Sequence, residues 1–389
     1  MTTPLQIGFI PLIDAAPLIV AVEKGFTRAE GLDVTLVREV SWSNVRDKLN
    51  IGLFDAAHVL APIPISSTLG LGHIKVPIVV PLTLNLNGNA ITVSPALHAA
   101  IMAEIDGDPL DPMATARALS RVVATRRRKG GEPLTFGMTF PFSTHNYLLR
   151  FWMAAGGVDP DEHVRLVVLP PPFMVDSIMS GQIDGFSVGA PWNSIAVDQG
   201  VGRILHFGSD IMQRAAEKVL AVRQLWAEKN PQTLAALVRS VVEAAKFIET
   251  PDNRNEVARI LARAEYLGVD AGVILRTLEG RLKIDADGTI RASDRYMMFA
   301  REGASAPDPL QAAWLYAQMV RWRQTAMRDE SLKTAMAVFK PDLYGDALKT
   351  DSASSLGKGS TIGAFAGPAF NPNDIAGYLA SLRVSLRDI

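Results

Sequence analysis

Short apolar segments alternate with helical segments along the first part of the chain. Leu5 to Pro11 and Leu32 to Val40 have the composition of strands, and Ala15 to Phe26 between them repeats apolar side chains with the period of a helix. The same alternation continues to a strand-like segment at Val76 to Leu84. Parallel strands need a crossover connection, and a helix commonly supplies it. The chain is therefore predicted to be an α/β protein with doubly wound, mainly parallel sheets.

This alternation pauses near residue 92 and resumes at Leu134. With 389 residues the chain is longer than one compact core usually supports, so we expect two lobes. Beyond residue 220 the pattern becomes mostly helical. The predicted parts are residues 1–92 for the start of lobe 1, residues 93–219 for lobe 2, and residues 220–389 for the return to lobe 1 with extra C-terminal helices. Two chain crossings are typical of binding proteins whose lobes close by a hinge.

One strand-to-helix turn in the predicted second lobe is a candidate ligand site. A strand over Leu134 to Phe140 precedes a helix for which Ser143 or Thr144 is the natural N-cap, and His145 follows directly. Free backbone N–H groups and the positive end of the helix dipole favour an anion at such a position. Most turns of this kind hold only water, so the turn by itself does not establish a site. In α/β sheets ligands bind at the carboxyl edge of the strands, and we expect three places to share one crevice, namely Thr144, Pro171 and Val188 with Gly189.

Charge and composition exclude several classes of function. Lys and Arg number 39 against 40 Asp and Glu, which leaves no electrostatic footprint for nucleic acid or an anionic membrane. No apolar run has the length of a membrane-spanning helix. The chain has no cysteine, and its six histidines show no metal-ligand spacing, so neither a metal nor a cofactor is expected. The GKGST segment near the C-terminus lacks the Ser or Thr that a phosphate-binding loop needs directly after its lysine.

The N-terminal residues enter a strand pattern at once. They show no basic region, apolar region or cleavage site of an export signal, which favours a cytoplasmic location. A mature exported protein whose signal has been removed is the alternative.

Several stretches, spread over nearly the full length, carry a family resemblance. They include GFIPLIDAAPLIVAVEKGF, TFGMTFPFSTHNYLLRFWMAAGGVDP, DGFSVGAPWNSIAVDQGVG and AEKVLAVRQLWAEKNP. In these stretches the chain resembles the nitrate- and bicarbonate-binding family of ABC-transporter solute receptors. The resemblance implies two α/β lobes of the periplasmic-binding-protein type (type II) with an anion in the cleft between them. It puts around that anion Trp42, Asn89, Thr144, His145, Pro171, Val188, Gly189 and Lys218.

The same resemblance indicates which anion is bound. Members that bind bicarbonate differ at the positions of His145 and Lys218, where they carry uncharged or acidic residues together with calcium. Both side chains here can carry a positive charge, and together with backbone N–H groups they suit planar nitrate or nitrite. Asn89 stands where the family's nitrate receptors carry Gln, so its amide is shorter.

Three functions compete on this basis. With a cytoplasmic location, the chain is similar to the nitrate/nitrite sensor of nitrate assimilation, whose partner is a response-regulator-type antiterminator that binds RNA. We therefore expect a sensor that binds the anion in the interlobe cleft and controls release of that partner. The alternative is a nitrate-binding solute receptor of an ABC transporter. Thiamine-pyrimidine synthases share the fold, but their Cys-rich iron-binding motif has no counterpart here, so an enzyme is not expected.

Overall fold

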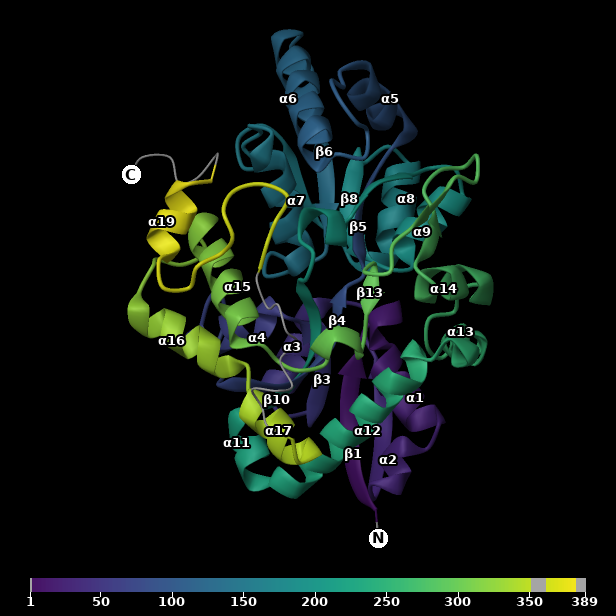
Figure 1. Ribbon diagram of the computed structural model, residues 1–389, viewed down its shortest axis with the longest axis vertical. Coiled ribbons are helices and arrows are strands. Elements are labelled where there is room, and N and C mark those ends of the chain that lie inside the picture. The colour runs from purple at the N-terminus through teal and green to yellow at the C-terminus, as the bar shows by residue number, and fades with distance from the viewer. Residues whose placement is uncertain (1, 351–361, 383–389) are drawn as a thin grey trace. The chain divides into compact units, whose positions relative to one another are not determined.

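The computed structural model describes residues 2–350 and 362–382 (Figure 1). It divides into two compact units. Unit 1 comprises the described residues of Met1–Asn87, Ala216–Glu279 and Met297–Ser360, and unit 2 those of Gly88–Ala215, Gly280–Tyr296 and Thr361–Ile389.

The unit boundaries differ from those of the predicted lobes. The predicted divisions at 92/93 and 219/220 lie a few residues after the observed ones at 87/88 and 215/216. The prediction also kept all of residues 220–389 with lobe 1, whereas the described part of Thr361–Ile389 and the insertion Gly280–Tyr296 belong to unit 2. This insertion forms a hairpin, β11 (Arg281–Lys283) and β12 (Ile290–Ala292), which is tied to unit 2 because Ile204 N donates to Ile284 O at 2.9 Å.

Unit 1 is built on a six-stranded mixed sheet in the order β13-β4-β10-β3-β1-β2. β1 is parallel to β2 and β3, whereas β10 is antiparallel to both β3 and β4. Every residue of β3 and β4 is buried, as expected for strands covered on both faces. The strands are β1 (Thr3–Phe9), β2 (Leu32–Arg38), β3 (Ala56–Leu60), β4 (Ile78–Asn87), β10 (Ala216–Arg223) and β13 (Met297–Met298).

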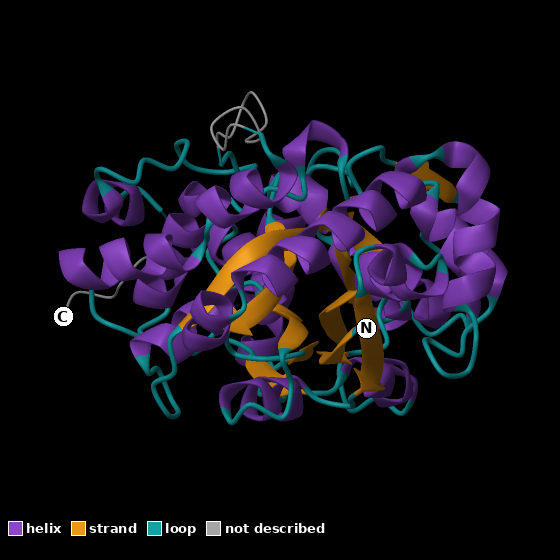
Figure 2. Cartoon of the chain, turned by 90° about the horizontal axis from the view of Figure 1, so that it is seen from below, coloured by secondary structure: helices purple, strands orange, loops and turns teal. Residues whose placement is uncertain are grey.

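Helices flank the strands of each unit (Figure 2). The longest described helix of unit 1, α12 (Pro231–Glu249), buries residues at the three- and four-residue spacing of one helical face. The other helices of unit 1 are α1 (Ala16–Glu23), α2 (Phe26–Ala29), α3 (Trp42–Asn50), α4 (Pro62–Leu69), α11 (Gln224–Lys229), α13 (Arg254–Leu261), α14 (Ala271–Leu278), α15 (Pro309–Arg321), α16 (Asp329–Val338) and α17 (Pro341–Leu348).

Unit 2 is built on a five-stranded mixed sheet in the order β7-β6-β8-β5-β9. β6 is parallel to β7 and β8, and β5 is antiparallel to β8 and β9. The strands are β5 (Asn89–Val93), β6 (Thr135–Met138), β7 (Arg165–Val168), β8 (Gly185–Gly189) and β9 (Arg203–Phe207). The helices are α5 (Pro95–Ala103), α6 (Pro112–Arg128), α7 (Thr144–Ala155), α8 (Met174–Met179), α9 (Trp192–Asp198), α10 (Gly208–Ile211) and α19 (Ile375–Ala380).

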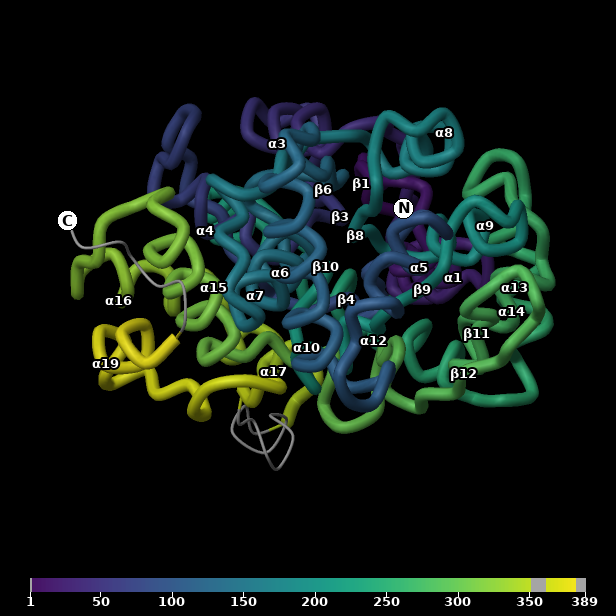
Figure 3. The backbone as a smooth tube through the Cα atoms, turned by 90° about the horizontal axis from the view of Figure 1, so that it is seen from above, coloured from purple at the N-terminus to yellow at the C-terminus, as the bar shows by residue number. Residues whose placement is uncertain are grey.

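Helix α7 begins at the position that the sequence predicted. Ser143 is the N-cap, and its hydroxyl accepts a hydrogen bond from Asn146 N at 3.1 Å. The helix lies side by side with α6 (Figure 3), and a Cβ on Gly156 would come within 2.2 Å of Ala116 O on that helix. Glycine at position 156 therefore allows the close approach of the two helices.

The α/β class predicted from the sequence is confirmed, with both sheets mixed. Residues 351–361, which contain the GKGST segment, lie outside the described residues. Residues 362–367 form no helix, and Ala364 makes an isolated bridge with Met212. Among the described helices, none combines the length and the apolar character required to cross a bilayer.

Candidate functional site

Lys218 of unit 1 lies at the centre of a buried ionic cluster. It is on β10, where its backbone N–H donates to Asn85 Oδ1 at 3.2 Å. Its ammonium group is 2.9 Å from Asp14 Oδ2 and donates a hydrogen bond to Glu217 Oε1 at 2.9 Å. The three side chains have no solvent exposure.

Two consecutive residues of a strand normally point to opposite faces, yet Glu217 and Lys218 meet. The pairing of β10 with β4 is irregular at this point, with register shifts on both sides of Lys218. Such an irregularity re-aims side chains. The bulge therefore lets the Glu217 carboxylate reach the neighbouring ammonium.

His58 fixes the other end of the cluster. Its Nε2 is 2.8 Å from Asp14 Oδ1, and its Nδ1 accepts a 3.4 Å hydrogen bond from Ile10 N. Because Nδ1 accepts from a backbone N–H, this network assigns the proton to Nε2, which donates to Asp14. Asp14 is thus held from two sides, by an imidazole and by an ammonium.

The ionisation states follow from burial and from these partners. Burial by itself would raise the pKa of Asp14, but the Lys218 charge and the His58 hydrogen bond outweigh it and lower this pKa to about 2. Burial lowers the pKa of His58, although the hydrogen bond that it donates to Asp14 acts against this. For Lys218, burial would lower the pKa, but Asp14 and Glu217 raise it above its ordinary value. At neutral pH the cluster therefore contains a charged Asp14, a neutral His58 and a charged Lys218.

Trp42 covers this cluster from the first turn of α3. Ser41 caps that helix by accepting from Asn44 N at 3.3 Å. The Trp42 ring lies 5.5 Å from Lys218 Nζ and 5.4 Å from the His58 ring. Its indole Nε1–H is buried and has no hydrogen-bond partner among the described residues. Buried N–H groups are almost always paired in native proteins, so this orphan donor beside an ammonium indicates a position for an acceptor.

Asp14, His58 and Glu217 were not among the predicted site residues. An aspartate just before a helix is usually read as its N-cap, but α1 begins at Ala16 and shows no side-chain cap, because the Asp14 carboxylate contacts Lys218 and His58 instead. A signal for them existed in the sequence. Each is a titratable residue within an apolar run, and such residues are rarely buried without a charged or hydrogen-bonding partner.

The predicted site residues of unit 2 gather at one edge of its sheet. Met138 at the end of β6 is aligned with Val168 of β7 and with Ser187 of β8, so the carboxyl ends of these parallel strands share that edge. β5 is antiparallel and contributes its first residue there. Located on this edge, or in the turns that leave it, are Asn89, Thr144, His145, Pro171, Val188 and Gly189.

His145 and Thr144 form the first turn of α7, and both side chains are fully buried. The His145 ring faces Thr139, whose Oγ1 is 3.5 Å from Nδ1. Ser143 uses its hydroxyl on Asn146 N, so the cap is supplied by Ser143 and Thr144 is the first helical residue. The backbone N–H groups at the start of α7 have the polarity that favours an anion, and the binding of an anion at this turn stays a prediction.

Neighbouring residues hold Asn89 and the end of β8 in place. Asn89 is aligned with Gly189 across the antiparallel pair. A Cβ on Gly208 would lie 2.2 Å from Asn89 Oδ1, so this glycine makes room for the amide. The Val188 carbonyl accepts from Asn193 Nδ2 at 2.8 Å. Gly208 and Asn193 were not predicted as site residues, because they position Asn89 and Val188 rather than being expected to contact a ligand themselves.

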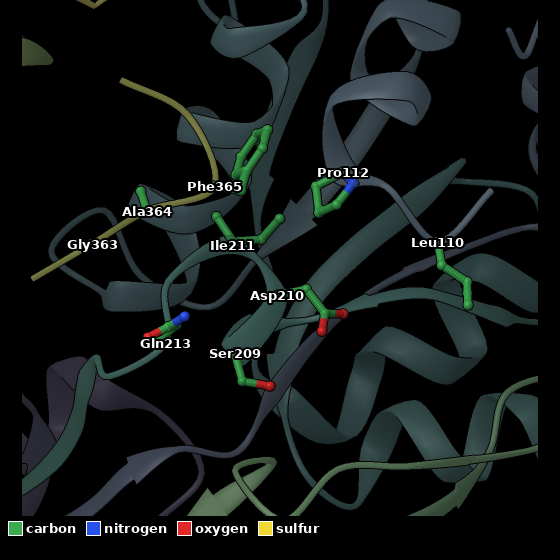
Figure 4. Close-up of a pocket in the computed structure, with 9 residues that line it drawn as sticks. All are labelled: Leu110, Pro112, Ser209, Asp210, Ile211, Gln213, Gly363, Ala364 and Phe365. Carbon is green, nitrogen blue, oxygen red and sulfur yellow. The ribbon is translucent and has the colours of Figure 1, made fainter. Parts of the chain in front are cut away.

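Unit 2 also contains a cavity of about 490 Å³ that none of the predicted residues lines. Figure 4 shows the Asp210 and Ser209 side chains on one side of it and the Gly363 to Phe365 segment on another. Asp210 is paired with Arg291 at 2.9 Å and accepts from Phe207 N at 2.7 Å. No cluster of metal-ligating side chains occurs within residues 2–350 and 362–382.

Comparison with known proteins identifies the class. A crystal structure of the periplasmic nitrate-binding protein NrtA from Synechocystis superimposes with a TM-score of 0.89 at 28% identity, covering 98% of this chain and 99% of that chain. The Nostoc nitrate/nitrite binding protein NrtA is 31% identical over 98% of this chain and 86% of its own length. The nitrate import ATP-binding protein NrtC of Synechocystis is 34% identical over 99% of this chain, which spans only 56% of that longer relative. The two-lobed, periplasmic-binding-protein-like fold predicted from the sequence is confirmed.

Residues 1–262 match the NMT1-like family. The chain belongs to this family and groups within it with the ABC-transporter solute receptors for nitrate and bicarbonate. A bicarbonate-binding protein CmpA of Synechococcus elongatus is 30% identical, so overall similarity does not choose between the two anions. These relatives are named as binding or transport proteins, which fits the expectation that the chain is not an enzyme.

The predicted cytoplasmic location is wrong. The solved relative, which this chain matches over almost its whole length, is a periplasmic receptor. The prediction rested on the first few residues, and a cleaved export signal leaves no trace in the folded part of a receptor.

Proposed function

We propose that this chain is the nitrate- and nitrite-binding receptor of an ABC importer and works outside the cytoplasm. Its partners are then the membrane subunits of that importer. The observation that supports this most directly is the Trp42 Nε1–H, which has no hydrogen-bond partner among the described residues. The Lys218 ammonium of the same unit lies 5.5 Å from the centre of the Trp42 ring. Both groups can donate a hydrogen bond to an anion.

The residues of unit 2 support the same ligand class. Thr144 and His145 at the start of α7 offer an N-terminal helix turn and an imidazole. According to the resemblance described above, bicarbonate receptors carry uncharged or acidic residues together with calcium at the positions of His145 and Lys218. The histidine and lysine found here favour nitrate and nitrite over bicarbonate.

The sensor function predicted from the sequence has lost its main support. It rested on the cytoplasmic location, and none of the relatives named above is described as a regulator. We therefore do not propose the antiterminator as a partner, and the solute receptor is the function that the relatives support.

Calorimetric titration with nitrate, nitrite, bicarbonate and taurine tests the proposal. We expect nitrate and nitrite to bind, and His145→Ala to weaken them by about tenfold to 150-fold, the loss of a charge-assisted hydrogen bond. His98→Ala is the matched control, because His98 lies on α5 after the opposite end of β5 and its loss is expected to leave affinity unchanged. Binding of bicarbonate in preference to nitrate would contradict the proposal.

A further inference from the structure

The Lys218 ammonium has little donor capacity left for a ligand. An ammonium carries three N–H groups. Two carboxylate oxygens, Asp14 Oδ2 and Glu217 Oε1, already lie 2.9 Å from Nζ. Glu217 accepts a hydrogen bond from one N–H, and the Asp14 carboxylate is an ion-pair partner at the same distance, so an anion can approach the ammonium only from its remaining side.

The same geometry brings any anion on Lys218 close to negative charge. An anion oxygen at a similar distance from Nζ, with the three oxygens spread about Nζ in roughly tetrahedral directions, lies roughly 5 Å from each of the two carboxylate oxygens. Asp14, Glu217 and Lys218 have no solvent exposure, so water screens this repulsion poorly. The attraction of the ammonium is thus opposed by its own partners, and a second negative charge on the anion increases the repulsion.

Asp14 cannot turn away from this position. Its second oxygen, Oδ1, is 2.8 Å from His58 Nε2, and His58 is anchored in turn by Ile10 N. Both side chains are fully buried. The negative charge of Asp14 is therefore a fixed feature of unit 1.

We propose that Asp14, held by His58, determines the charge selectivity of the receptor: its fixed carboxylate admits monoanions and rejects dianions. The inference rests on the proposed function, in which Lys218 contacts the anion. In this inference Asp14 repels dianions, whereas Lys218 attracts the anion that the receptor binds.

Nitrate and carbonate provide a direct test, because both are planar with three oxygens and differ by one charge. Each is titrated at an alkaline pH at which carbonate is doubly charged. In the wild-type protein we expect carbonate to bind far more weakly than nitrate. In Asp14→Asn the ratio of the carbonate to the nitrate dissociation constant should fall about tenfold or more, because one fixed negative charge is removed.

Asp33→Asn is the matched control. Asp33 is an exposed residue on β2 of the same unit, and its substitution changes the net charge of the protein by the same amount. The ratio should stay at the wild-type value in this control and should return towards it in Asp14→Glu, which restores the charge. A purely structural role of Asp14 would weaken both anions together and leave the ratio unchanged.

Glu217→Gln removes the other carboxylate from Lys218 and is expected to lower the ratio in the same direction. It supplies the test if Asp14→Asn does not fold. An unchanged ratio in the folded variants overturns the selectivity proposal and leaves nitrate binding intact. Failure of the wild-type protein to bind nitrate overturns both this inference and the proposed function.

Discussion

Replacing Lys218 by methionine is expected to lower the free energy of unfolding by about 3–5 kcal/mol, the usual loss when one partner of a buried ion pair is removed. Methionine keeps the length of the side chain but leaves Asp14 and Glu217 without the ammonium that lies 2.9 Å from each. Guanidinium unfolding measures the change. Lys246→Met, on the exposed part of α12, is the control and should change stability by less than about 0.5 kcal/mol.

A second substitution separates the cause from a packing defect. Adding Asp14→Asn to Lys218→Met removes one of the stranded charges and should recover part of the lost stability. A non-additive recovery is the sign of direct coupling between the two residues. The account of the cluster fails if Lys218→Met alone is as stable as the Lys246→Met control.

Stability is also expected to fall in mild acid because of His206 in unit 2. Burial, followed by the nearby Arg291 charge, lowers the pKa of His206 to about 3. The imidazole is fully buried, bonded to Thr115 Oγ1 at 2.6 Å, with Asp210 Oδ2 at 4.0 Å. At pH values between the ordinary pKa of about 6.5 and the lower pKa in the folded protein, the His206 imidazole binds a proton in the unfolded chain but not in the folded chain.

The stabilisation from neutral His206 is therefore complete above about pH 6.5 and decreases by about 1.4 kcal/mol for each pH unit below it. His206→Gln should remove this part of the slope, measured by denaturant unfolding between neutral pH and about pH 5. His58 remains in the variant and contributes a slope of the same sign, because its pKa is also lowered. His163→Gln, at a partly exposed histidine, is the control. Equal slopes in the wild-type protein and in His206→Gln would contradict the assignment.

The parts of the fold that depend on local pattern could be predicted from the sequence. Helix α7 with its Ser143 cap follows from a capping residue, an apolar period and a glycine pair. The gathering of Thr144, Pro171 and Gly189 at one sheet edge follows from the rule that parallel strands end together. The assignment of these residues to the anion remains a prediction.

The parts that depend on distant pairing could not be predicted. Nothing in the apolar pattern of Ala216–Arg223 shows that β10 inserts antiparallel between β3 and β4. The role of Asp14 was hidden for the same reason. An aspartate before a helix is an ordinary cap until the fold brings Lys218 and His58 to it.

The position of β10 has a consequence for the order in which the protein acquires structure during synthesis. The five strands of the unit 2 sheet all lie within Gly88–Ala215 and leave the ribosome together. The unit 1 sheet lacks an inner strand until Ala216–Arg223 has been made, so β3 and β4 emerge early and then wait with unpaired edges. The nascent chain thus has every strand of the unit 2 sheet before it can complete the unit 1 sheet, and in that interval the edges of β3 and β4 are open to pairing with another chain.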